Sequence, residues 1–142
     1  MLEMFEQIWS APKGAEEQQF QNVQEWLCEN RFPVCSLPNS YIELLKECNG
    51  GNFTNGNREY QMFSIEEAVQ AYEIYNFSVY MPFAFPFAMD GCGNFYILNL
   101  RKYDEAVYAI SSGDLEWEEC RKIADNFINC LVQKEALEEL ML

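Results

Sequence analysis

The sequence of 142 residues has no histidine and few basic residues: 9 Lys and Arg stand against 23 Asp and Glu, which gives a formal net charge of −14 at pH 7. Histidine is the commonest general base and the commonest metal ligand in proteins, so its absence excludes Ser-His-Asp and Cys-His catalysis. Direct binding of nucleic acid is not expected, because it depends on Lys and Arg residues that neutralise phosphates. A charged partner of this chain is expected to be basic.

Long apolar runs are missing as well. The longest apolar stretch, 81–89, is interrupted by Pro82 and Pro86, and it is far shorter than the roughly 20 residues that a membrane-spanning helix needs. Residues 1–9 have neither the basic start nor the unbroken apolar core of a secretory signal. We therefore expect a cytoplasmic protein that makes no contact with a membrane.

Apolar surface, in contrast, is plentiful, since 49% of the residues are hydrophobic and 15% are aromatic. This composition supports a folded core and excludes an acidic disordered chain, because such chains are poor in aromatic residues. No repeat and no linker rich in Gly, Ser or Pro divides the sequence. We expect a single domain of residues 1–142, in which 1–14 form an N-terminal extension.

The cysteines give no sign of a metal site. No pair has the spacing Cys-x-x-Cys, and without histidine a zinc site would need four thiolates from distant segments. We expect no metal, no cofactor and no disulfide, and we expect the thiols to act as small buried hydrophobic groups. Cys48, Cys120 and Cys130 fit this role best, because each falls on the apolar stripe of a predicted helix. The others are Cys28, Cys35 and Cys92.

Apolar residues at helical spacing predict four helices. Pro38 suits the first turn of the second helix because it has no N–H to satisfy, and Tyr41 lies on the apolar stripe of that helix. Asn49-Gly50-Gly51 ends it, because these residues accept the left-handed backbone conformation. Ser64 and Glu67 form a capping-box pattern that opens the third helix. The predicted helices cover 15–30, 38–48, 65–75 and the region from about 118 onward.

The segment Asp90-Gly91-Cys92-Gly93 between two apolar runs is the strongest hairpin signal in the sequence. Gly91 and Gly93 permit a positive φ, while Asp90 and Asn94 have side chains that cap backbone N–H groups. A phosphate or calcium loop is the alternative, but the segment lacks the Lys and the repeated acidic ligands of such loops. The runs that flank the turn, 85–89 and 94–101, are the predicted arms of the hairpin, and 94–101 is predicted as a central strand. Further strands are predicted over 59–63 and 105–110, whereas 52–57 reads as turn and 77–86 as irregular or as an edge strand.

Two blocks of the sequence are similar to motifs of a known family. The first is Leu37-Pro38-Asn39-Ser40-Tyr41, which leads to Asn49-Gly50-Gly51, and the second is the hairpin Asp90-Gly91-Cys92-Gly93-Asn94 with its flanks. With the segment 63–68 between them, they resemble the SUKH superfamily, which includes many bacterial immunity proteins and a fungal cell-wall synthesis regulator. The resemblance implies an α+β fold, in which helices flank a twisted, largely antiparallel or mixed sheet.

The resemblance also implies a binding protein and not an enzyme. Bacterial members belong to polymorphic toxin systems, in which the immunity protein binds and neutralises a cognate toxin in the producing cell. The partner would then be a basic toxin, such as a nuclease. The alternative is a regulatory scaffold without a toxin partner, as in the fungal branch. A homodimer through aromatic residues of 75–87 is a further alternative to their burial in the core.

The stretch 104–119 contains acidic residues without any Lys or Arg and with aromatic residues between them. Acidic groups steer a basic partner, and an aromatic side chain such as Trp117 can serve as a buried anchor. The alternatives are a solvated loop whose Trp117 folds into the core, and a catalytic carboxylate pair, for which no residue stands out. The predicted partner-binding residues are Asp104, Glu105, Asp114, Glu116, Trp117, Glu118 and Glu119.

Overall fold

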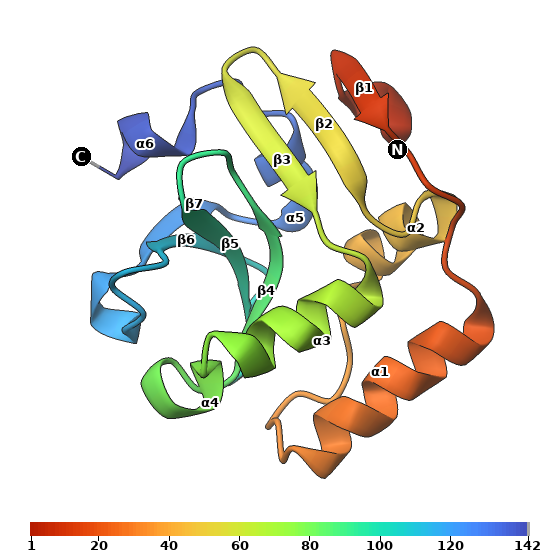
Figure 1. The fold of residues 1–142 in the computed structure, drawn as a ribbon, viewed down its shortest axis with the longest axis vertical. Coiled ribbons are helices and arrows are strands. Elements are labelled where there is room, and N and C mark those ends of the chain that lie inside the picture. The colour runs from red at the N-terminus through yellow and green to blue at the C-terminus, as the bar shows by residue number, and fades with distance from the viewer. Residues whose placement is uncertain (142) are drawn as a thin grey trace.

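The computed structural model describes residues 1–141, and its centre is a seven-stranded antiparallel sheet (Figure 1). Each strand pairs with the strand before it and the strand after it in the chain, so the spatial order equals the sequence order. The expected α+β fold is confirmed. The strands are β1 (Gln7–Ser10), β2 (Gly51–Asn55), β3 (Arg58–Met62), β4 (Ala84–Met89), β5 (Asn94–Asn99), β6 (Val107–Ser111) and β7 (Arg121–Ala124).

Helices cover both faces of the sheet. Phe95 of β5 points to the face of α3 and α4, where its ring lies 5.4 Å from that of Phe77. Tyr96 points to the other face, because successive residues of a strand alternate. There Phe87 contacts both Tyr96 and Tyr41 of α2. The helices are α1 (Glu17–Glu29), α2 (Asn39–Glu47), α3 (Ile65–Ile74), α4 (Phe77–Tyr80), α5 (Phe127–Leu131) and α6 (Leu137–Leu140), with 3-10 turns η1 (Leu2–Met4) and η2 (Trp117–Glu119).

The first three predicted helices are present. α2 follows Pro38 and buries Tyr41, Leu44 and Leu45. After it, Gly50 has φ +96°, and a Cβ there would lie 2.8 Å from the backbone nitrogen of Ser64. This close approach and the positive φ both require glycine. The side chain of Asn49 accepts a hydrogen bond of 2.9 Å from the backbone N–H of Ile65, so the end of α2 is joined to the start of α3.

The capping box and the hairpin turn both form. The hydroxyl of Ser64 accepts from the backbone N–H of Glu67, whose carboxylate accepts from the backbone N–H of Ser64. In the turn, Asp90 accepts from the backbone N–H groups of Cys92 and Asn94, each at 2.9 Å, and from the amide side chain of Asn94. Gly93 has φ +85°, but the positive φ expected at Gly91 is not found. The N–H of Gly91 instead donates to Glu59 of β3. These contacts give the whole motif a structural role, which is to form the hairpin turn.

Two strand predictions are wrong. The segment 52–57, expected as turn, is mostly strand β2, and its turn is reduced to Gly56 and Asn57. This segment forms a strand in spite of its polar residues, because β1 and β3 pair with it on either side. The prolines of 77–86 suggested an irregular segment or an edge strand, yet Pro86 lies within central strand β4. It is tolerated because β3 pairs with β4 only at Ala88 and Met89, and because the register shifts just after Pro86.

The predicted closing helix is wrong as well. From Trp117 the chain forms η2, then β7, and only then the short helix α5. The exposed edge of β6 recruits residues 121–124 as a strand, and pairing with a sheet edge overrides helical spacing. The side chain of Asn126 then caps α5 by accepting from the backbone N–H of Asn129.

Other expectations are met only in part. Of the six free cysteines, Cys48 and Cys130 are buried, Cys35 and Cys120 are half-buried, and Cys28 and Cys92 are exposed. Cys120 is outside any helix. The expected N-terminal extension contributes strand β1, and the ring of Phe5 stacks on that of Phe53 at 4.4 Å. The helices that the structure describes are all too short or too polar to cross a membrane.

Candidate functional site

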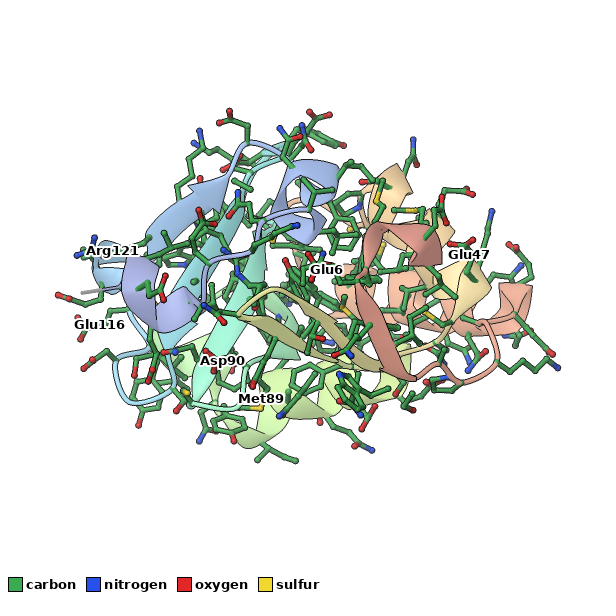
Figure 2. The ribbon with its side chains drawn as sticks, turned by 90° about the horizontal axis from the view of Figure 1, so that it is seen from above. Glu6, Glu47, Met89, Asp90, Glu116 and Arg121 are labelled. Atoms are coloured by element: carbon green, nitrogen blue, oxygen red, sulfur yellow. The ribbon has the colours of Figure 1, made fainter. Side chains whose placement is uncertain are left out.

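Acidic side chains from two distant segments meet in a groove of about 680 Å³. The connection between β6 and β7 supplies Asp114, Glu118 and Glu119, and α6 supplies Glu138. Arg121 is the one basic residue among those that line it. The end of the β4–β5 hairpin closes the groove with Cys92 and Asn94, and Ile110, Ser111, Cys120 and Met141 complete its lining. We call this the acidic groove. Figure 2 shows Arg121 and Glu116 at the opposite end of the molecule from Glu47.

The thiols of the acidic groove are poor nucleophiles. The Cys92 thiol donates a hydrogen bond to the carboxylate of Glu138, which raises the pKa of the thiol. Burial raises the pKa of the Cys120 thiol, and the nearby Arg101 opposes this effect only in part. A nucleophilic cysteine needs a lowered pKa, since the thiolate is the reactive form. The acidic groove thus has no activated thiol nucleophile. Its four carboxylates suit it to holding a cationic group by charge and hydrogen bonding.

Trp117 does not stand free beside this groove. Its indole N–H donates a hydrogen bond of 2.9 Å to the backbone carbonyl of Pro82. The guanidinium of Arg101 lies 3.6 Å from the centre of its ring, and the ring of Tyr108 contacts it edge-on. The half-buried side chain thus fastens η2 to the connection before β4. Of the two arrangements considered for Trp117, the structure has the one in which its side chain packs against the core.

Asp104 is also tied into the fold. Its carboxylate accepts hydrogen bonds from the hydroxyl of Tyr108 at 2.6 Å, from the backbone N–H of Ala106 and from the amide of Asn99. Partial burial acts to raise the pKa of Asp104, but these hydrogen bonds outweigh it and lower that pKa. Burial and the bond to Asp104 raise the pKa of Tyr108 to about 12. Asp104 shapes the β5–β6 connection by these bonds.

The seven predicted partner-binding residues do not line a single groove. Asp104 and Glu105 line a second groove, of about 810 Å³, beside α2 and α5, and this groove shares no residue with the acidic groove. Glu116 is exposed next to η2 without lining either groove. Asp104 and Glu105 precede β6 and Asp114 follows it, so these acidic residues enter different grooves. The binding role of the seven residues stays a prediction.

The comparison with protein families is decisive for the class of this chain. A family model described as the SMI1 / KNR4 family (SUKH-1) matches residues 14–133. The chain belongs to the SMI1/KNR4 family. The SUKH resemblance of its motifs is thereby confirmed. Membership supports a role in protein interaction or immunity, in a family known for immunity and regulatory proteins. A search of curated proteins gives no significant match.

The part of the chain that matches the SMI1/KNR4 family model ends before the residues that form one wall of the acidic groove. Glu138 and Met141 lie beyond residue 133, so α6 adds to the groove from outside the matched region. Sequence reasoning missed Glu138 as a site residue, because only the fold brings α6 to the connection between β6 and β7. It also gave no sign that Arg101 stacks on Trp117 beside the acidic stretch. A charge count along the chain contains none of this information.

The aromatic residues of 75–87 divide between core and surface. Phe77, Phe85 and Phe87 are fully buried, whereas Tyr75 and Tyr80 are exposed. Burial was the expected outcome for most of this stretch, and the exposed tyrosines depart from it. No group of three or more His, Cys, Asp or Glu in residues 1–141 is placed to hold a metal ion.

Proposed function

We propose that this SMI1/KNR4-family protein is an immunity protein, which binds a basic cognate toxin in the cytoplasm of the producing cell and neutralises it. The observation that carries the proposal is the acidic groove, where Asp114, Glu118, Glu119 and Glu138 face a single lining cation, Arg121. The net charge of −14 surrounds this groove with a negative field. Family membership supports protein binding as the mode of action.

The groove would act by attraction and obstruction. A negative field raises the association rate of a positively charged partner, and the effect weakens as salt screens the charges. Carboxylates hold Lys and Arg side chains by charge-assisted hydrogen bonds. A nuclease is the toxin class that fits best, because it must present a basic surface to bind phosphates. Carboxylates seated on that surface would take the place of the substrate's phosphates.

The test takes the protein domains encoded by the genes next to the gene for this chain, and it uses a basic one among them as the candidate toxin domain. We expect this domain to bind the wild-type chain, with an association rate that falls as the salt concentration rises. The double variant Glu118→Lys/Glu119→Lys should bind at least about tenfold more weakly, because it reverses two charges of the groove. The growth of cells that produce the toxin should be rescued by the wild-type chain and not by this variant.

The matched control is Glu17→Lys/Glu25→Lys, which makes the same change of charge on the exposed surface of α1. It should bind nearly as the wild type does, and it separates the groove from the effect of net charge. Equal weakening by both double variants would remove the groove from the proposal. A wild-type chain that binds no neighbouring toxin domain would contradict the immunity function and favour the regulatory scaffold.

A further inference from the structure

The end of α3 and the short helix α4 form an exposed apolar surface. Ile74, Val79 and Tyr80 are 72%, 70% and 60% exposed, and Tyr75 is 39% exposed. We call these four side chains the α3–α4 patch. The other exposed large apolar side chains of residues 1–141 are dispersed at Ile8, Trp9, Tyr103 and Val132. Single exposed apolar residues need no explanation, but four of them within seven consecutive residues indicate an interaction surface.

Buried neighbours in the sequence fix the backbone that carries the α3–α4 patch. Asn76 adopts a left-handed conformation with φ +56°, which turns the chain from α3 into α4. Phe77 and Met81 are fully buried, and the ring of Phe77 stacks on that of Tyr72 at 5.8 Å. Because residues four apart lie on one face of a helix, the residues between them point outward. Val79 and Tyr80 are thus presented on a fixed backbone.

The surroundings of the patch are acidic. Between Arg58 and Arg101 the sequence contains no Lys or Arg, so α3 and α4 have no basic residue of their own. The hydrogen bond from Trp117 to Pro82 brings η2, with Glu118 and Glu119, to the chain just after α4. Figure 1 shows α4 and the pale blue segment that precedes β7 on the same side of the molecule. Of the cations on neighbouring segments, Arg101 is stacked on Trp117, and Arg31 directly precedes Phe32, whose ring lies 5.2 Å from that of Tyr72.

Charge decides between the possible occupants of this patch. A second copy of the chain would bring another net charge of −14 to an acidic surface, and like charges oppose such an association. Nucleic acids and anionic membranes are disfavoured for the same reason. A protein with apolar side chains bordered by Lys and Arg complements both the patch and its acidic border.

We infer that the α3–α4 patch is a docking surface for a basic protein partner, whose apolar side chains cover Val79 and Tyr80. The inference rests on the proposed function, because the partner is the same basic toxin. The patch assigns that partner a second, apolar contact beside the acidic groove. Long-range charge mainly sets the association rate, while buried apolar contacts mainly set the dissociation rate. The two surfaces therefore have separable kinetic effects.

The experiment measures the binding of the neighbouring toxin domain to Val79→Ser/Tyr80→Ser by surface plasmon resonance. We expect the dissociation rate to rise at least about tenfold, because truncation of central aromatic contacts has effects of this size. The association rate and its dependence on salt should stay within about twofold of the wild type. Both replaced side chains are exposed, so the thermal midpoint should not change.

The control is Trp9→Ser/Val132→Ser, which truncates one aromatic and one β-branched side chain at exposed positions outside the patch and outside both grooves. It should dissociate as the wild type does. Dissociation from Val79→Ser/Tyr80→Ser at the wild-type rate would overturn the inference, while weaker binding by Glu118→Lys/Glu119→Lys in the same assay would leave the proposed function standing. A wild-type chain that does not bind the toxin domain would overturn both. A homodimer in sedimentation velocity that Val79→Ser/Tyr80→Ser abolishes would assign the patch to a second copy and also overturn the inference.

Discussion

Arg58 is a fully buried cation whose guanidinium binds only neutral groups. It donates hydrogen bonds to the backbone carbonyl of Glu135, to the side chain of Gln133 at 2.9 Å and to the hydroxyl of Tyr60 at 3.3 Å. None of the ion pairs among residues 1–141 includes it. These bonds hold the segment after α5 against the β2–β3 hairpin. We predict that Arg58→Met destabilises the protein, although methionine has a similar length and removes a buried charge.

The magnitude follows from two opposing terms. A hydrogen bond from a charged donor contributes about 1.5 to 3 kcal/mol, so the three bonds of Arg58 to oxygen acceptors together contribute about 6 kcal/mol. A fourth, to the Sγ of Cys130, is long at 4.0 Å and is not counted. The cost of burying one charge is several kcal/mol and opposes them, at about 4 kcal/mol. We expect Arg58→Met to lower the free energy of unfolding by about 2 kcal/mol. In a domain of this size that corresponds to a thermal midpoint lower by roughly 6 °C.

The assay combines thermal and urea unfolding, followed by circular dichroism, with amide hydrogen exchange. The N–H of Asn57 donates to the carbonyl of Lys134 at 2.9 Å, so its exchange reports directly on the release of the clamped segment. This amide should exchange faster in Arg58→Met by more than the global loss of stability explains. The control Arg121→Met replaces an exposed arginine and should change the stability by less than about 0.5 kcal/mol. If Arg58→Met is as stable as the wild type or more stable, the reasoning that hydrogen bonding outweighs desolvation is refuted.

Two further predictions concern the connections of the fold. Gly50→Ala should lower the stability by about 2 kcal/mol in urea unfolding, because alanine is strained at φ +96° and its Cβ meets the backbone of Ser64; an unchanged midpoint would contradict this. Tyr108→Phe should raise the pKa of Asp104 toward its ordinary value of 3.8, measured by NMR titration of the carboxyl carbon. Because the folded pKa of Asp104 is lowered, its stabilising effect is present above that ordinary value and is lost as the pH falls through the folded pKa. The stability difference between wild type and Tyr108→Phe that is due to Asp104 should therefore shrink in acid, and a constant pKa in the variant would count against this role of Tyr108.

The elements with local signals could be predicted from the sequence. α2 has its proline start, its apolar stripe and its glycine end, and α3 has its capping box, all within a few residues of one another. The β4–β5 hairpin is similarly specified by Asp90, Gly93 and Asn94 in the turn itself. In each case, side chains close in sequence make the contacts that define the element, so no tertiary information is needed.

The elements that depend on distant partners could not be predicted in this way. β2 looks like a turn until β1 and β3 are placed on either side of it, and β7 has helical spacing until the edge of β6 is available. The candidate site has the same limitation. The contact of Glu138 with Cys92, and that of Arg101 with Trp117, join segments whose sequences contain no mutual signal. Arg58 is the extreme case, because charged residues are almost never fully buried.

The strand order of the sheet has a consequence for how the protein is made. Because each strand pairs only with its neighbours in the chain, every strand from β2 onward finds its first partner already synthesised when it leaves the ribosome. The sheet can thus grow strand by strand during translation, without waiting for a distant segment to complete its centre. The groups that accept hydrogen bonds from Arg58, at Gln133 and Glu135, follow β7 in the chain. The buried guanidinium therefore stays without these partners until all strands of the described sheet have been synthesised, so its closure comes after the sheet has grown.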